Sequence, residues 1–127
     1  MREVNNMGIA KDNLERITEK INNSTKAQKV FVTNISGKEV HWNMTFQFNL
    51  DNEEPFYLEI KDSKVSLFDG GADDPEIILS GENEAIKRIC EGQGDFTHAI
   101  SREEITVEKG KVMDVIRLTR AINIVLR

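Results

Sequence analysis

The sequence predicts an α+β fold in which an antiparallel sheet carries its helices on one face. The first observation is residues 42–50, where every even position is large and apolar and every odd position is polar. A period of two over nine residues is typical of a half-buried antiparallel strand. The second observation is that such alternation fills the middle of the chain, whereas apolar residues recur with helical spacing towards both ends.

The first predicted element is a helix over residues 9–23, because Ile and Leu recur there among charged residues with helical spacing. Residues 29–35 alternate in a way that predicts a strand. A turn is expected at residues 36–38, where Ser, Gly and Lys follow one another. The long strand comes next, over residues 39–50, and contains the alternation described above.

Two further strands are expected at residues 56–60 and 64–68, joined by a turn at residues 62–63. An acidic loop with two glycines follows at residues 69–75. Residues 76–79 are predicted to form a short strand, which ends a meander of about five strands.

Helical spacing returns after this meander. A helix is predicted to begin at Ser80 and to end at Gly92 and Gly94. Glu82 and Glu84 would lie in its first turn, where carboxylates suit the positive end of the helix dipole.

The remaining elements are short except for the last. Residues 95–100 predict one or two helical turns, residues 104–108 a final strand, and residues 111–125 an amphipathic helix. The predicted order is thus a helix, about five strands, two helices, one strand and one helix.

The length of 127 residues predicts a single domain over residues 1–127. The net charge of −5 disfavours a nucleic-acid-binding protein, because neutralising phosphates requires clustered Lys and Arg. No apolar run reaches the roughly 18 residues of a membrane span, and the first residues lack the apolar core of a signal peptide. Because Cys90 is the only cysteine and allows no internal disulfide, we expect a cytoplasmic protein.

Charge is distributed unevenly along the chain. Residues 51–76 contain nine acids against two bases, whereas residues 109–127 contain five bases against Asp114. One interpretation is that both stretches are solvated surfaces. The other is that the basic C-terminal helix contacts an anionic head group or, transiently, a membrane surface.

Residues suited to catalysis or metal binding are few. His41 and His98 lie outside any recognisable motif, and Cys90 is expected on the apolar face of its helix, where a thiol is inert. Two scattered histidines and one cysteine do not make a zinc site, and residues 69–74 lack the ligand spacing of a calcium loop. We therefore expect a protein that is not an enzyme and that uses no cofactor or metal.

The predicted apolar surfaces leave two interpretations open. The even face of residues 42–50 would join residues 56–60 and the apolar faces of the two long C-terminal helices in a solid core. The alternative is a cavity, because the strand side chains are long and soft and the amphipathic terminal helix would act as a movable lid.

The ordered set of elements resembles the sterol carrier protein 2 family of lipid-binding domains over about residues 10–125. The segments that carry the resemblance are, in chain order, His41–Phe46, Asp74–Leu79, Ala85–Gly92, Phe96–Ile100, Ile105–Val107 and the amphipathic last helix. The chain departs from the family around the last strand. Residues 102–104 stand where a Gly-Lys pair is usual, and Gly110 follows the strand one residue late.

The resemblance implies a five-stranded antiparallel sheet with helices on one face and a hydrophobic tunnel between the two layers. It also implies noncovalent binding of sterols, fatty acids, acyl-CoA esters or other lipids, without catalysis. By position, the residues that would line the tunnel are Trp42, Met44, Phe46, Phe48, Leu58, Ile86, Ile89, Val115, Ile116 and Ile122.

A second function fits the same fold. The chain would then be a protein-interaction or accessory module of lipid or quinone metabolism, or would associate with itself, without transporting lipid. A third hypothesis, an enzyme that uses His41 or His98, has no motif behind it. Neither the identity of the ligand nor the oligomeric state follows from the sequence.

Overall fold

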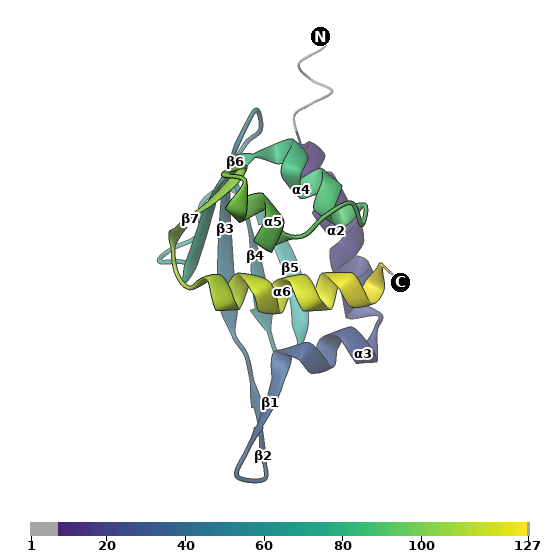
Figure 1. Ribbon diagram of the computed structural model, residues 1–127. Coiled ribbons are helices and arrows are strands. Elements are labelled where there is room, and N and C mark those ends of the chain that lie inside the picture. The colour runs from purple at the N-terminus through teal and green to yellow at the C-terminus, as the bar shows by residue number, and fades with distance from the viewer. Residues whose placement is uncertain (1–7, 127) are drawn as a thin grey trace.

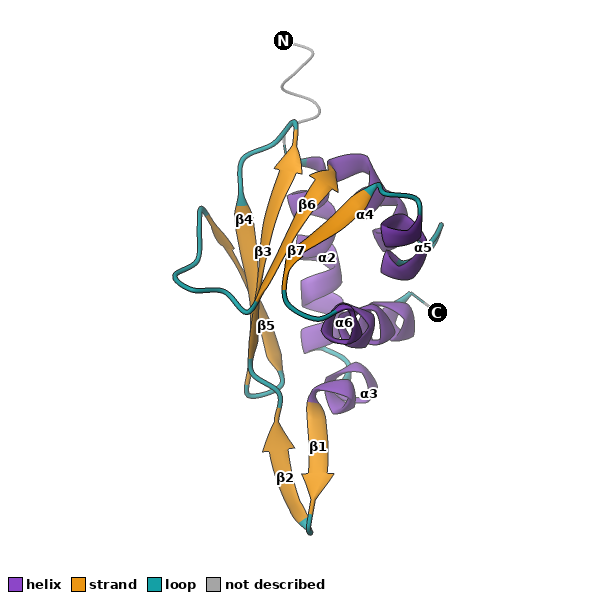
Figure 2. Ribbon diagram, turned by 60° about the vertical axis from the view of Figure 1, so that its left-hand side comes forward, coloured by secondary structure: helices purple, strands orange, loops and turns teal. Residues whose placement is uncertain are grey.

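The computed structural model of the protein describes residues 8–126, which form two layers and one projecting hairpin (Figure 1). One layer is a sheet, and the helices lie on one side of it, as Figure 2 shows. The helical elements are α2 (Ile9–Asn22), α3 (Thr25–Gln28), the 3-10 turn η1 (Lys29–Phe31), α4 (Asn83–Cys90), α5 (Phe96–Ser101) and α6 (Val112–Val125). The strands are β1 (Val32–Ile35), β2 (Lys38–His41), β3 (Met44–Asp51), β4 (Phe56–Lys61), β5 (Lys64–Asp69), β6 (Ile77–Glu82) and β7 (Ile105–Lys109). The predicted α+β class is confirmed.

The main sheet has five strands in the order β5-β4-β3-β6-β7. Neighbouring strands are antiparallel except β3 and β6, which run parallel, so the prediction of a purely antiparallel sheet is wrong for this pair. The cause is the connection after β5, in which residues 70–76 carry the chain past β4 to the far side of β3. A period of two in the sequence cannot reveal this, because it occurs in half-buried strands whichever way their neighbours run.

The predicted strand over residues 39–50 is two strands that belong to different sheets. Strand β2 pairs with β1 in the projecting hairpin, and β3 begins at Met44 in the main sheet. Trp42 and Asn43 separate them, and the backbone N–H of Trp42 donates to the carbonyl of Phe31 at 2.7 Å. This hydrogen bond closes the base of the hairpin at the point where it leaves the main sheet.

The segment before the hairpin also differs from its prediction. The predicted strand over residues 29–35 is extended only from Val32 onwards, and the short helix α3 precedes it. Ser24 accounts for α3, because its hydroxyl accepts a hydrogen bond from the N–H of Ala27 at 3.1 Å and so caps the helix.

Helix α4 begins at Asn83 rather than at Ser80. Ser80 and Gly81 continue β6, because they pair with β3 on one side and with β7 on the other. Gly81 has a φ of +132°, and a Cβ atom at this position would overlap the carbonyl oxygen of Glu104. The close approach of β7 therefore requires glycine here and delays the start of the helix.

The core lies between the sheet and the helices. Phe46 and Phe48 of β3 are fully buried and lie opposite Leu58 and Phe56 of β4. The rings of Phe48 and Phe56 stack with their centroids 5.0 Å apart. The helices add buried residues to the same apolar cluster, among them Leu14, Ile17, Ile21, Ile86, Ile89, Phe96, Val115, Leu118 and Ile122.

The opposite face of the sheet is also partly covered. Gln47 occupies a polar position of the alternation, yet its side chain is buried. Its amide nitrogen donates to the carbonyls of Phe56 and Gly70, and its amide oxygen accepts from the N–H of Ala72 at 2.7 Å. The loop after β5 thus packs over β3, and Gln47 satisfies the backbone groups that this loop buries.

Candidate functional site

The structure places the residues predicted to line a tunnel in the core, with one exception. Seven of the ten are buried: Phe46, Phe48, Leu58, Ile86, Ile89, Val115 and Ile122. Trp42 and Met44 are half-buried and pack against the same cluster, whereas Ile116 is half-buried outside it. Sheet and helices therefore bring nine of these residues together, and their contact with a ligand stays a prediction.

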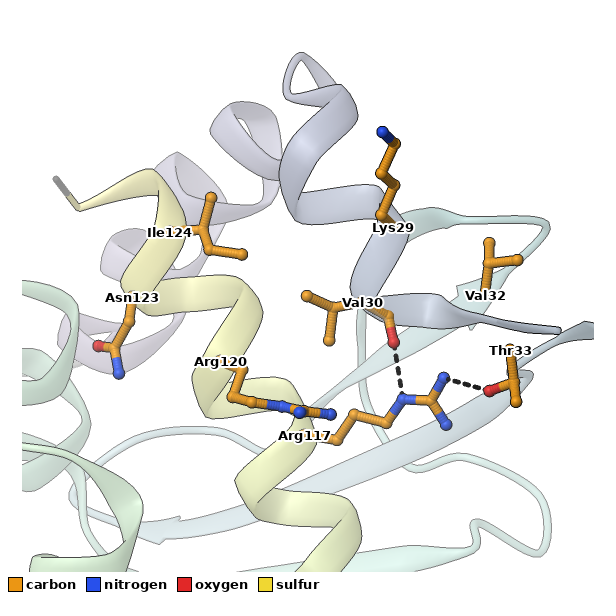
Figure 3. Close-up of a pocket in the computed structure, with 8 residues that line it drawn as sticks. All are labelled: Lys29, Val30, Val32, Thr33, Arg117, Arg120, Asn123 and Ile124. Carbon is orange, nitrogen blue, oxygen red and sulfur yellow. Dashed lines mark hydrogen bonds between the residues drawn. The ribbon is translucent and has the colours of Figure 1, made fainter.

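A pocket of about 690 Å³ lies beside this core, between α6 and the segment that connects α3 to the hairpin (Figure 3). Its lining residues are Lys29, Val30, Val32, Thr33, Arg117, Arg120, Asn123 and Ile124. Three of them are cations, three are aliphatic and two are neutral and polar. No carboxylate is among them, and we call this site the basic pocket.

Arg117 connects the two walls of the basic pocket. Its Nε donates to the carbonyl oxygen of Val30 at 2.7 Å, and its Nη2 donates to the hydroxyl of Thr33 at 3.1 Å, as the dashed lines in Figure 3 show. Its guanidinium carbon lies 4.6 Å from the centroid of the Trp42 ring, which is a cation–π distance. These contacts hold α6 against the base of the hairpin and fix the position of the charge.

The electrostatics of the pocket favour an anion. Partial burial and the charge of Arg120 lower the pKa of Arg117, while the charge of Asp114 acts in the opposite direction. Among the described residues, no carboxylate forms a salt bridge with Lys29, Arg117 or Arg120. The three cations therefore form a positive site that an anionic group would neutralise.

Trp42 joins the basic pocket to the apolar core. Its ring stacks on Phe31 with centroids 5.9 Å apart and meets the ring of Phe46 edge-on at 6.0 Å. The same indole also contacts the Arg117 guanidinium, which belongs to the basic pocket. A molecule with an anionic head and an apolar tail would find both of its environments next to Trp42.

Part of this site was accessible from the sequence. Trp42 belongs to the predicted tunnel lining, and Arg117 and Arg120 belong to the basic stretch of residues 109–127. Lys29, Val30 and Thr33 were not predicted. A strand prediction over residues 29–35 conceals the 3-10 turn that carries Lys29 and Val30 towards α6.

None of the residues with catalytic potential is among those that line this pocket. His41 Nδ1 lies 3.0 Å from the hydroxyl of Ser63 at an exposed site, and no carboxylate among the described residues bonds to His41. His98 Nδ1 lies 3.1 Å from the carboxylate of Asp95, which also accepts the His98 N–H and so caps α5. Burial raises the pKa of the Cys90 thiol to about 12, so this residue is a protonated core side chain at neutral pH.

Over the part of the chain that the structure describes, no three His, Cys, Asp or Glu side chains are grouped in a way that would hold a metal ion. Across residues 8–126, the helices are also too short or too polar to cross a bilayer.

Comparisons with known proteins agree on the fold. A family model described as the SCP-2 sterol transfer family matches residues 12–121. A comparison with curated protein sequences finds no match.

Among solved structures, a UbiJ-SCP2 ubiquinone synthesis protein superimposes with a TM-score of 0.65 at 11% identity, covering 87% of this chain and 90% of that one. A sterol carrier protein 2 gives a TM-score of 0.63 at 11% identity, with 91% and 95% covered. Palmitated SCP2L2 from Aedes aegypti gives 0.55 at 20% identity, with 85% and 92% covered.

A larger protein contains a similar unit. The sec-alkylsulfatase Pisa1 from Pseudomonas sp. gives a TM-score of 0.53 at 11% identity over 64% of this chain, which spans only 12% of that enzyme. At such identities the likeness to these structures shows a shared fold alone.

Proposed function

This chain belongs to the SCP-2 sterol transfer family, and we propose that it binds a lipid or another apolar molecule that carries an anionic head group. The apolar tail would lie between the sheet and the helices, among the residues predicted to line a tunnel. The head group would lie in the basic pocket, against Lys29, Arg117 and Arg120. The protein would hold the ligand noncovalently and catalyse no reaction on it.

The observation that carries this proposal is the position of the Trp42 indole between two unlike environments. One face of the proposed site is aliphatic and aromatic, beginning with Phe31 and Phe46. The other is cationic, beginning with Arg117. Amphiphiles such as fatty acids have this combination of chemistry within one molecule, whereas a wholly apolar molecule would leave the basic pocket unused.

The energetics of tail burial are sufficient for binding. Removing one methylene from water is worth about 0.8 kcal/mol, so a sixteen-carbon chain would gain on the order of 12 kcal/mol. The loss of ligand freedom and the ordering of protein side chains offset several kcal/mol of this gain. A micromolar Kd corresponds to about 8 kcal/mol and is consistent with that balance.

Entry of the tail requires α6 to move, because the proposed lining residues Phe46, Ile86 and Val115 are fully buried. Arg117 would hold α6 in its closed position, since it donates hydrogen bonds to Val30 and Thr33 across the basic pocket. An incoming anion would compete for the guanidinium and would favour release of α6. The helix would then act as a lid over the tail.

Fatty acids are the first ligands to test, because the similar SCP2L2 from Aedes aegypti is described as palmitated. We also propose a cytoplasmic location, since the single Cys90 allows no internal disulfide. Transient contact of α6 with a membrane surface belongs to the same proposal, because ligand exchange with a bilayer needs such contact.

Native mass spectrometry of the purified protein, followed by organic extraction and lipid identification, tests the proposed function. We expect an adduct of lipid mass and displacement of a fluorescent fatty-acid probe by palmitate. A clean mass of the free protein without any probe binding would contradict the proposal. Arg120→Gln removes one positive charge from the basic pocket and should weaken binding of the probe. Lys64→Gln is its control for a general loss of positive charge, because Lys64 is exposed on β5, outside the basic pocket.

A second candidate function is a protein-interaction module without lipid transport. More broadly, the chain would be an accessory module of lipid or quinone metabolism, and the shared fold of the UbiJ-SCP2 ubiquinone synthesis protein is consistent with this role. In that case the protein would form a complex or a dimer while the fatty-acid probe fails to bind. Sedimentation at several concentrations, carried out beside the probe assay, distinguishes the two functions.

A further inference from the structure

The hairpin of β1 and β2 is the most exposed part of the described chain. It extends away from the two layers of the molecule (Figures 1 and 2). Residues 33–41 are all exposed, yet they include Ile35 and Val40, whose exposed fractions are 55% and 44%. Two aliphatic side chains so far from the core contribute nothing to its packing.

Strand register places these two side chains on the same face of the hairpin as Thr33, which is one of the residues that line the basic pocket. Thr33 pairs with Val40, and Ile35 pairs with Lys38. Because side chains alternate along a strand, all four lie on one face. Thr33 is also the residue that binds Arg117, so this face continues directly from the wall of the basic pocket.

Helix α6 extends the same surface on the other side of the pocket. Met113 has an exposed fraction of 71% and lies one turn before Arg117, hence on the same face of the helix. The resulting surface consists of the apolar residues Ile35, Val40 and Met113 and the cations Lys29, Lys38, Arg117 and Arg120; we call it the docking surface.

The acids near this surface are few. Glu39 lies on the opposite face of the hairpin, where it pairs with Asn34. Asp114 is close enough to Arg117 to influence its pKa, and it is the acid next to Met113 in the chain. The docking surface is thus cationic on a protein whose net charge is −5.

We propose that the docking surface binds an anionic lipid bilayer. Exposed aliphatic side chains among Lys and Arg are the pattern by which proteins lie at a membrane interface. The apolar residues would enter the head-group region, and the cations would contact lipid phosphates. Binding through this surface would orient the opening of the basic pocket towards the bilayer. In this respect the inference rests on the proposed function, which takes the ligand from a membrane.

Flotation with vesicles tests the proposal. The full chain should float with vesicles that contain phosphatidylglycerol and should bind at least about tenfold more weakly to vesicles of phosphatidylcholine alone or at high salt. The double variant Ile35→Ser/Val40→Ser should lose about tenfold in vesicle binding while its unfolding midpoint stays unchanged, because both side chains are exposed. Phe68→Ser is the matched control, since Phe68 is an exposed apolar residue on β5 and should leave vesicle binding unchanged.

Three results would overturn the proposal. One is equal binding to anionic and neutral vesicles. Another is a loss of vesicle binding with Phe68→Ser as large as that with Ile35→Ser/Val40→Ser. The third is a concentration-dependent dimer or a stable protein complex that Ile35→Ser/Val40→Ser abolishes while no vesicle binding occurs. The fatty-acid probe assay without vesicles separates this proposal from the proposed ligand site. Probe binding without flotation removes the docking surface and the membrane contact of α6 but leaves the ligand site. Flotation without probe binding removes the ligand site and leaves the docking surface.

Discussion

The two sides of the Trp42 indole differ in burial, in charge and in the forces that hold them. On the inner side, Phe46 and its neighbours are fully buried and are held by packing. On the outer side, the basic pocket has three cations, and its shape depends on Arg117 and the two hydrogen bonds that it donates. Substitutions on the inner side should therefore change stability, and those on the outer side should change binding.

The largest expected effect belongs to the inner side. Phe46→Ala should lower the free energy of unfolding by about 3–5 kcal/mol, because it removes a fully buried ring that packs against Trp42 and lies opposite Leu58. Denaturant unfolding followed by circular dichroism measures this loss. Phe46→Leu should retain most of the stability, and an unchanged midpoint for Phe46→Ala would contradict the described core.

Trp42→Ala should affect both sides of the comparison. The residue is half-buried, so we expect a loss of about 2 kcal/mol in the free energy of unfolding. The same change should weaken binding of a fatty-acid probe, because Arg117 loses the ring beneath its guanidinium. Trp42→Phe keeps an aromatic face and serves as the control in both assays. Loss of stability without any change in probe affinity would separate Trp42 from the ligand site.

Arg120→Gln should change binding alone. Its side chain is exposed, so the free energy of unfolding should move by no more than about 0.5 kcal/mol. The affinity for a fatty acid should fall about three- to tenfold, which corresponds to roughly 0.7–1.4 kcal/mol. The affinity for the uncharged alcohol of the same chain length should not change. Equal losses for the acid and the alcohol would show that no head group lies in the basic pocket.

The smallest effect concerns Cys90, and it is absent at neutral pH. Burial raises the pKa of this thiol from 9.0 to about 12, so the folded protein keeps the proton that the unfolded chain loses. Below pH 9 the thiol is protonated in both states and does not change the stability, whereas between pH 9 and 12 only the unfolded chain loses the proton, so the free energy of unfolding falls. The unfolding midpoint of the wild type should therefore fall more steeply above pH 9 than that of Cys90→Ala. Parallel pH profiles would contradict the burial of Cys90.

The inner side was largely predictable from the sequence. Alternation over residues 42–50 and helical spacing over residues 111–125 identified Phe46, Phe48, Val115 and Ile122 as inward-facing, because burial imposes a period on the chain. The parallel pairing of β3 with β6 was not predictable, since it depends on where residues 70–76 run in space. The same loop explains why Gln47, a polar residue by its period, is buried.

The outer side was predictable only in its charges. The five bases among residues 109–127 indicated a cationic helix, but nothing in the sequence shows that Arg117 reaches Val30 and Thr33, more than eighty positions earlier. That contact arises because α3 and η1 redirect the chain beneath α6. Tertiary arrangements of this kind have no local period and therefore leave no local signal.

The most direct test of the central claim is the orientation of a bound fatty acid. Two spin-labelled fatty acids, one labelled near the carboxylate and one at the methyl end, would be added to the protein and their line broadening compared by NMR. We expect the first to broaden the indole signal of Trp42 and the second to broaden the methyl signals of Ile86 and Ile89. Two results would contradict a ligand whose head group lies in the basic pocket and whose tail lies in the core. One is that both labels broaden the Ile86 methyl signals equally, and the other is that neither label broadens the Trp42 or the Ile86 and Ile89 signals.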